Sequence, residues 1–226
     1  MPDTDLELFF DPVCPFCWIT SRWVVEVARL RELTVRWRPI SLWMLNHEDA
    51  DPDAPLSRTQ QEGLAQLRVV AAVEREHGPD PIGPLYTALG SAIWDAEPAG
   101  DGGFGPLLER VGAGLDVRVS LASVGLATHL AAAREDTSLD TVIRASTDEA
   151  LARVGGGVGT PVLSFAPPDG PAFFGPVLSR IPRGDDALAL FDAVTTLAHT
   201  PSFAELKRSQ RELPDLPVLA RSADDA

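Results

Sequence analysis

The sequence predicts an α/β fold in which a β-α-β unit and a later β-β-α unit are separated by an all-helical insertion. Three observations lead to this prediction. Residues 6–41 hold two strand-like stretches around one helical stretch, residues 45–154 show helical patterns and no convincing strand, and strand patterns return after residue 160. The chain has 226 residues, 45% of them hydrophobic, which is enough to bury a sizeable core.

The N-terminal unit is predicted from three short patterns. Residues 6–11 form an apolar stretch that predicts a strand, and residues 17–31 carry apolar side chains at helical spacing. Residues 34–41 alternate between apolar and polar side chains, as a half-buried strand does. The first forty residues therefore predict a β-α-β unit.

The middle of the chain begins at an acidic, proline-broken stretch, residues 49–55. Glycine and proline clusters divide the residues that follow into helical segments, and Ser120 and Ser138 are suitable N-caps for two of them. We therefore predict a helical insertion over residues 45–154. Its expected helices cover residues 56–77, 84–95, 104–112, 120–134 and 138–153.

The C-terminal unit is predicted from a hairpin pattern followed by a helix. Two short apolar stretches, 161–165 and 172–175, flank a turn that contains two prolines and a glycine. Residues 184–198 then show a helical pattern, and residues 202–211 suggest a further helical segment. We expect residues 1–44 and 155–212 to form one domain, with a flexible tail at 213–226.

Cys14 and Cys17 are the only cysteines in the chain, and they lie where the first strand meets the first helix. The first thiol of such a pair is at a helix N-terminus, where unpaired backbone N–H groups and the helix dipole favour a thiolate. Cys14 is therefore the predicted nucleophile. Cys17, one turn later, is placed to resolve a mixed disulfide.

A zinc site, a structural disulfide or two unrelated thiols would account for the cysteine pair less well. A structural zinc site needs about four ligands, and the histidines are scattered without ligand spacing. A structural disulfide between residues three apart would close a very short loop and remove little chain entropy. Two unrelated buried cysteines remain an alternative, although Pro15 between them favours a helix start.

The order of elements, with a CxxC motif after the first strand, is that of a thioredoxin-like fold interrupted in its middle. In this fold a cis-proline precedes the third strand and faces the CxxC motif. Residues 155–161 (GGGVGTP) lie at that position, so we expect a cis bond between Thr160 and Pro161. The alternative is an ordinary glycine-rich loop with a trans proline.

Composition argues against several classes of partner. The net charge of −14 disfavours binding to nucleic acid and to anionic membranes. No apolar run approaches the roughly twenty residues of a membrane span, and no secretory signal is visible, so we expect a cytoplasmic protein with a reduced dithiol. We predict no metal, and no bound nucleotide, because no glycine-rich fingerprint opens a helix after a strand.

Longer motifs resemble the DsbA-like thioredoxin superfamily and, within it, the actinobacterial mycothiol-dependent nitroreductases. The most specific stretch is FFGPVLSRIPRG at residues 173–184, whereas the CxxC motif alone is generic. The likeness spans residues 6 to about 212. The other matching stretches are FDPVCPFCWITSRW (10–23), Ser41-Leu42 with Leu45-Asn46, His77-Gly78 with PLYTALG (84–90), VGTP (158–161) and FAELKR (203–208).

The resemblance implies a cytosolic enzyme that takes electrons from mycothiol, a low-molecular-weight thiol, and reduces nitro compounds or other small electrophiles. Carried over to this chain, it makes Cys14 the nucleophile, Cys17 the resolving cysteine and Thr160-Pro161 the cis-proline element, with the insertion closing over the motif. One departure is Phe16, where family members carry tryptophan. Phenylalanine lacks the indole N–H, so substrate preference should differ while thiol exchange remains.

The candidate substrate-binding residues surround the motif or could stack on a flat substrate. Trp18 follows the motif directly and could form the rim of the cleft, and Tyr86, the single tyrosine, could donate a hydrogen bond; an ordinary core position is the alternative for each. Trp23 and Trp37 are expected in the core. The full candidate set is Pro15, Phe16, Trp18, Tyr86, Thr160 and Pro161.

Four functional hypotheses follow from these observations. The first is mycothiol-dependent reduction of small electrophiles. A protein-directed disulfide oxidoreductase would use the same dithiol on protein partners. A kappa-type glutathione transferase or isomerase has a serine or a single thiol at the nucleophile position, so the intact CxxC argues against it. A non-enzymatic redox sensor would change shape on oxidation without turnover.

Overall fold

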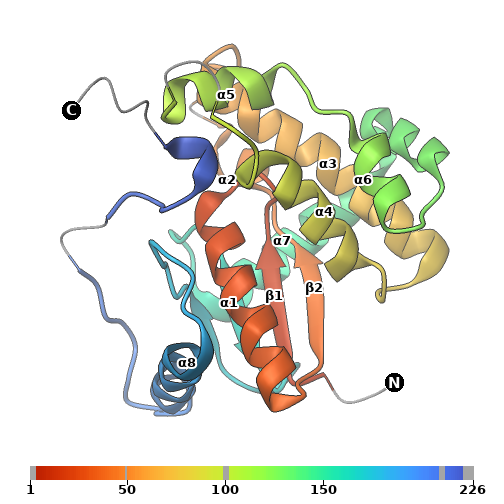
Figure 1. The fold of residues 1–226 in the computed structure, drawn as a ribbon. Helices are drawn as coiled ribbons and strands as arrows, with labels where there is room; N and C mark the ends of the chain where they lie inside the picture. Colours follow the sequence, from red (N-terminus) through yellow and green to blue (C-terminus); the bar gives the residue numbers. More distant parts are fainter. Residues whose placement is uncertain (1–3, 49, 99–101, 209–211, 221–226) are drawn as a thin grey trace.

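A four-stranded sheet in the order β2-β1-β3-β4 forms the centre of the fold (Figure 1). The computed structural model describes residues 4–48, 50–98, 102–208 and 212–220. β1 pairs in parallel with β2 and antiparallel with β3, and β3 pairs antiparallel with β4. The strand bounds are Leu6–Phe10 (β1), Val35–Pro39 (β2), Val162–Phe165 (β3) and Ala172–Phe174 (β4). The predicted β-α-β and β-β-α units are therefore confirmed, including the hairpin.

Helices cover both faces of the sheet, which explains why every residue of β1 is buried. α1 (Pro15–Arg31) and α8 (Gly184–Ala198) lie on one face, and α7 (Asp140–Val154) lies on the other (Figure 1). The indole N–H of Trp23 in α1 donates to the carbonyl of Ala187 in α8, over 2.9 Å. Trp23 and Trp37 are buried, as expected from the sequence.

A buried ion-pair network fastens α7 to the sheet. Glu7 of β1 is only 4% exposed, and its carboxylate contacts Arg38 of β2 at 3.2 Å and Arg153 of α7 at 2.7 Å. A buried carboxylate is tolerated when it is paired in this way. Because α7 packs on β2 and β4, we propose that the insertion ends before this helix and not at residue 154.

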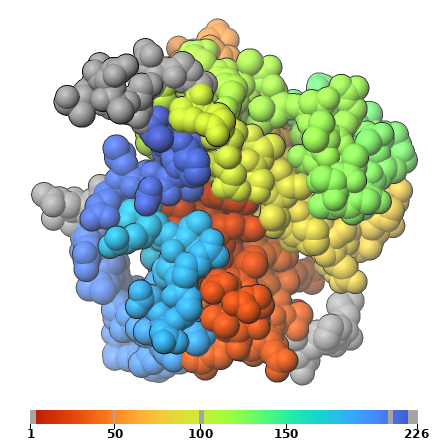
Figure 2. Space-filling model, in the orientation of Figure 1, coloured from red at the N-terminus to blue at the C-terminus, as the bar shows by residue number. Residues whose placement is uncertain are grey.

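The remaining helices of the insertion stand at one end of the sheet. α3 packs along α5, and α4 packs on α1, so that the insertion rests directly against α1 (Figure 2). The bounds are α2 Leu42–Asn46, α3 Pro55–His77, α4 Ile82–Trp94, α5 Phe104–Gly112 and α6 Val117–Ser123, followed by the 3₁₀ helices η1 Thr128–Glu135 and η2 Thr137–Leu139.

Two predicted helices are wrong. The single helix expected over residues 120–134 is instead α6 and η1, separated at Gly125, whose φ of 75° is a left-handed conformation that suits glycine. Residues 202–208 of the helix expected at 202–211 are not helical, and residues 209–211 lie outside the described residues. There the Phe203 ring stacks on Phe173 of β4 with centroids 6.0 Å apart, a tertiary contact that local propensity does not anticipate.

The chain after residue 213 is not wholly free, which differs from the flexible tail expected there. The short 3₁₀ helix η3 (Pro217–Leu219) packs against α4 and α5, and the side chains of Leu216 and Val218 are 5% and 1% exposed. Burial of these apolar side chains holds the segment in place. Residues 221–226 lie outside the described residues. No described helix has the length and apolar character needed to cross a membrane.

Candidate active site

Cys14 occupies the N-cap of α1, directly after the turn that leaves β1. Its backbone is extended, Pro15 begins the helix, and the Cys14 sulfur accepts a hydrogen bond from the Cys17 N–H over 3.4 Å. Proline suits the first helical position because its missing N–H would be unpaired there. Both thiols are free; Cys14 is 5% exposed and Cys17 is fully buried. The arrangement has the geometry expected of a nucleophile followed by a resolving thiol.

The two thiols have opposite electrostatic environments. A hydrogen bond from the Cys17 thiol lowers the pKa of Cys14, although burial opposes this effect. Burial raises the pKa of Cys17 well above its ordinary value, and the neighbouring Cys14 raises it further. Of the two, Cys14 is therefore the more acidic thiol and the one whose thiolate forms more readily.

The loop before β3 brings Thr160 and Pro161 to the motif. The Thr160–Pro161 bond is cis, as predicted, and the Cys14 sulfur lies 4.0 Å from the Thr160 carbonyl oxygen. The antiparallel pairing of β3 with β1 causes this proximity, because it places the start of β3 beside the end of β1. The structure thus joins two motifs that are separated by more than a hundred residues in the sequence.

Asp11, between β1 and the cysteines, holds the turn in position. Its carboxylate accepts hydrogen bonds from the Val13 N–H at 3.0 Å and from the Leu42 N–H at the start of α2, at 2.8 Å. Its carbonyl accepts the Cys14 N–H at 3.1 Å. Complete burial raises the pKa of Asp11 to about 7, and the two backbone hydrogen bonds only partly offset this.

An apolar cavity of about 290 Å³ opens beside the CxxC motif. The motif supplies Val13, Pro15 and Phe16 to its wall, and the insertion supplies most of the remainder. Those remaining residues are Leu42, Leu56, Thr59, Gln60, Ile93, Trp94, Phe104, Leu107, Leu108 and Val111. Pro15 and Phe16, two of the candidate substrate-binding residues, therefore line this cavity together with the insertion. Their contact with a substrate stays a prediction.

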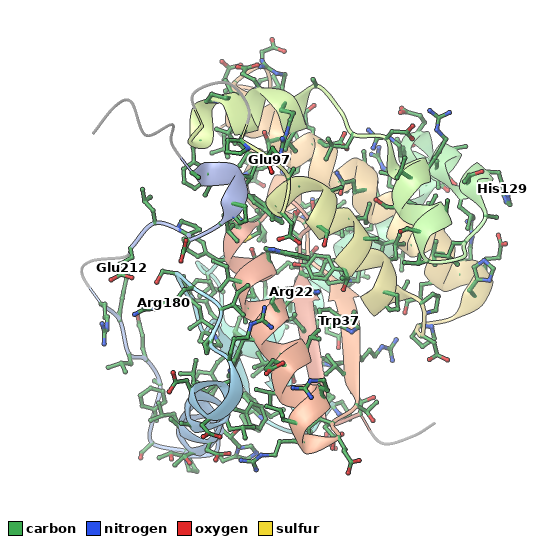
Figure 3. All side chains as sticks on the ribbon, viewed as in Figure 1. Arg22, Trp37, Glu97, His129, Arg180 and Glu212 are labelled. Atoms are coloured by element: carbon green, nitrogen blue, oxygen red, sulfur yellow. The ribbon has the colours of Figure 1, made fainter. Side chains whose placement is uncertain are left out.

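Trp18 is not at the rim of this cavity, so that expectation is wrong. The ring is 1% exposed, and the Arg22 guanidinium lies 4.2 Å from the ring centroid. Figure 3 shows Arg22 on α1, beside α4. Gly90 of α4 leaves the space for the ring, because a Cβ there would lie 2.2 Å from the Trp18 Cζ3. Trp18 instead joins α1 to the insertion.

Tyr86 is also in the core and does not line the cavity. It is fully buried, its ring centroid is 4.0 Å from that of Phe10, and burial raises the pKa of its hydroxyl well above the ordinary value. A direct contact with substrate, expected from the sequence, has no support in this position. Sequence reasoning missed the walls contributed by α3 and α5, Gln60 among them, since only tertiary packing brings those helices to the motif.

Comparison with known proteins identifies the family. A model of the Rv2466c-like proteins, described as mycothiol-dependent nitroreductase Rv2466c, matches residues 13–208. The chain belongs to this family. The matched range includes both cysteines, the Thr160–Pro161 element and every described residue of the cavity wall. Membership makes the protein a thiol-dependent oxidoreductase, which favours an enzyme over a non-enzymatic sensor.

The chain is also similar to individual proteins. The uncharacterized protein Rv2286c of Mycobacterium tuberculosis is 32% identical over 206 residues, covering 91% of this chain and 82% of its own. A candidate protein disulfide isomerase from Nitrosomonas europaea superposes with a TM-score of 0.51 at 13% identity, covering 85% of this chain and 98% of its own. The cytosolic disulfide reductase DsbM of Pseudomonas aeruginosa gives a TM-score of 0.48 at 18% identity, covering 85% and 99%. The superposition on the Nitrosomonas europaea protein, together with the sheet order and the CxxC motif at the start of α1, identifies the fold as thioredoxin-like and of DsbA type.

Proposed function

We propose that the protein reduces nitro compounds or other small electrophiles with mycothiol as electron donor, and that Cys14 is the reacting group. The observation that carries the proposal is the position of Cys14. Its sulfur is at the N-terminus of α1, 4.0 Å from the Thr160 carbonyl, and its neighbours in the chain line an apolar cavity. A thiolate beside an apolar cavity suits attack on an apolar electrophile.

The dithiol can supply two electrons in two steps. The Cys14 thiolate attacks the electrophile, and the Cys17 thiol then attacks the Cys14 sulfur, which releases the reduced product and forms a Cys14–Cys17 disulfide. The sulfur of a low-molecular-weight thiol next attacks Cys14, and a second thiol molecule restores the dithiol and leaves as the disulfide. Each cycle consumes two thiols and transfers two electrons and two protons.

The choice of mycothiol rests on family membership. Thr160, before Pro161, presents its backbone beside Cys14 and is the group we propose to align the incoming thiol. A cytoplasmic location is part of the proposal, because turnover with a low-molecular-weight thiol needs a reducing compartment.

The test is reduction of a nitroaromatic compound by the purified protein with mycothiol or glutathione as the sole donor. We expect turnover with mycothiol, none with Cys14→Ser, and a trapped mixed disulfide with Cys17→Ser, detected by mass spectrometry. Full activity of Cys14→Ser would overturn the proposal. Equal turnover with glutathione would support the proposed reaction and contradict the choice of mycothiol as the specific donor.

A protein-directed disulfide oxidoreductase is the second candidate. Leu56 and Phe104 line the cavity and are 56% and 36% exposed, so apolar surface at the cavity is available to a protein partner. This candidate predicts covalent protein complexes with Cys17→Ser in cell extracts of the source organism. The absence of such complexes would count against it.

A further inference from the structure

The cavity beside the CxxC motif contains two polar side chains among its described walls, Thr59 and Gln60 of α3. The Thr59 hydroxyl is satisfied within the protein, since it lies 2.9 Å from the Pro55 carbonyl and 3.0 Å from the Leu108 carbonyl. The Gln60 side-chain amide makes no hydrogen bond to any described residue, although the residue is only 7% exposed. Gln60 is therefore the free polar group of an otherwise apolar cavity.

The amide of Gln60 is not among the fully buried polar atoms that lack a partner in the described residues. It therefore reaches the open space of the cavity, where water or a ligand can pair with it. The neighbouring Gln61 shows the ordinary solution, because its amide donates to the Pro52 carbonyl over 2.8 Å, away from the cavity. Gln60, in contrast, has no protein partner among the described residues and lies in the cavity wall, so its amide is free to bind a ligand there.

We propose that Gln60 is a specificity-determining residue, which donates a hydrogen bond from its amide to an oxygen acceptor on a compact, neutral, otherwise apolar substrate. The inference deepens the proposed function and rests on it, since it takes the cavity to be the substrate site. Nitro, carbonyl and N-oxide groups are acceptors of the required kind. An anionic substrate is disfavoured, because no basic side chain is among the described walls.

The size of the cavity agrees with a substrate of this class. A dry apolar cavity of roughly 150 Å³ holds benzene, and this one measures about 290 Å³. Apolar contact with Phe16 and Trp94 would hold the ring, and the hydrogen bond from Gln60 would fix its direction. Because Val13 and Pro15, on either side of Cys14 in the chain, line the same wall, a fixed direction determines which end of the substrate lies toward the motif.

The experiment measures binding in the absence of turnover. The full-length Cys14→Ser protein is combined with Gln60→Leu, and with Gln61→Leu as a matched control that makes the same chemical change outside the cavity. The probes are nitrobenzene and acetophenone, which carry an oxygen acceptor, and isopropylbenzene, which has a similar shape without one. Ligand-observed NMR titrations give the three dissociation constants.

We expect Gln60→Leu to weaken nitrobenzene and acetophenone binding about three- to tenfold, the range of one net hydrogen bond. Isopropylbenzene should bind as well as before, or better, and Gln61→Leu should change none of the three. Equal loss for all three probes with a folded protein, or no loss for any, would overturn the proposal. If Gln60→Leu does not fold, Gln60→Met tests the same contrast.

Failure of the proposed function would look different. If no Cys14-dependent nitroreduction is found but binding still selects the oxygen acceptor and depends on Gln60, the proposed reaction would be wrong and the proposed role of Gln60 would stand. If the wild type turns over and Gln60→Leu has the same kcat and KM, the proposed reaction would stand and the proposed role of Gln60 would be wrong.

Discussion

Cys14 and Cys17 are one helical turn apart, and their pKa values are shifted in opposite directions. Both are buried, and burial alone would keep both protonated. Cys14 differs because its sulfur receives the Cys17 amide and a hydrogen bond from the Cys17 thiol, so that a charge on Cys14 is stabilised at the cost of one on Cys17. The difference between the thiols is therefore a property of the pair.

Selective alkylation tests this difference. In the reduced protein at pH 7, iodoacetamide should modify Cys14 at least roughly tenfold faster than Cys17, because the pKa of Cys14 is lowered and that of Cys17 is raised. Peptide mass spectrometry over a time course gives both rates. The Cys14→Ser variant provides the control for Cys17 reactivity, and similar rates at the two sites would contradict the assignment.

Asp11 predicts an unusual pH dependence of stability. The pKa of Asp11 is about 7 in the folded protein, above the ordinary value of 3.8, so folding binds a proton between these values. The stability that this proton supplies is complete below about pH 4 and is lost as pH rises through 7, a difference of up to about 4 kcal/mol. Asp11→Asn removes this titration. The difference in unfolding free energy between this variant and the wild type should therefore shift in favour of the variant when the pH is raised from 5 to 8.

Urea unfolding at the two pH values measures the effect. Asp148→Asn, the same substitution at an exposed position of α7, controls for loss of a charge. A stability difference between Asp11→Asn and the wild type that stays constant from pH 5 to pH 8 would show that Asp11 does not titrate in this range.

At the scale of elements, α4 approaches α1 closely enough to exclude any side chain at Gly90. A Cβ at this position would lie 2.2 Å from the Trp18 ring, which packs against Tyr86 and Arg22 on its other sides. Gly90→Ala should therefore destabilise the protein by about 1–3 kcal/mol despite the higher helix propensity of alanine. Denaturant unfolding provides the measurement.

Gly105→Ala in α5 is the matched control for this prediction. A Cβ at Gly105 meets nothing within 4 Å, so propensity alone should act and stability should rise by up to about 1 kcal/mol. If both alanine variants were stabilised equally, the contact between α4 and α1 would not be as tight as described.

The sequence identified elements with strong periodicity and missed those that depend on tertiary contacts. The strands, α1, α3 and α8 follow from local patterns that burial reinforces. The stretch at 120–134 has helical composition, but Gly125 and tertiary packing divide it. The 202–208 stretch also has helical composition, yet Phe203 is stacked on Phe173 in non-helical chain.

The same division applies to the site. Cys14, Cys17 and the cis-proline element were predictable because local motifs define them. Gln60 was not, since a glutamine on a helix is ordinary until the fold shows which cavity it faces. Trp18 was placed wrongly because proximity in sequence to a motif does not reveal the side of α1 on which a residue lies.

At the scale of the whole molecule, the insertion and the sheet share one hydrophobic core. Leu8 and Phe10 of β1, Trp18 of α1 and Leu85 of α4 belong to the same buried cluster, together with side chains of α3 and α5. The candidate active site lies at this junction, because the motif comes from one unit and most of the cavity wall from the other. Neither unit has a complete site alone.

A shared core predicts that the insertion and the sheet unfold together. In a Cys14→Ser background, Cys17 is the only thiol and is fully buried in α1, so its alkylation in denaturant reports opening of the thioredoxin-like unit. Far-UV circular dichroism reports the helices, most of which belong to the insertion. The two transitions should have the same midpoint.

A variant within the insertion makes this test decisive. Leu85 is fully buried in α4, so Leu85→Ala should cost about 2–5 kcal/mol and lower both midpoints equally. Val119→Ala, at a position in α6 that is 71% exposed, should move neither. A shift of the dichroism transition alone would mean that the insertion unfolds independently. The cavity would then open and close without disturbing Cys14. That result would contradict the packing of α4 on α1.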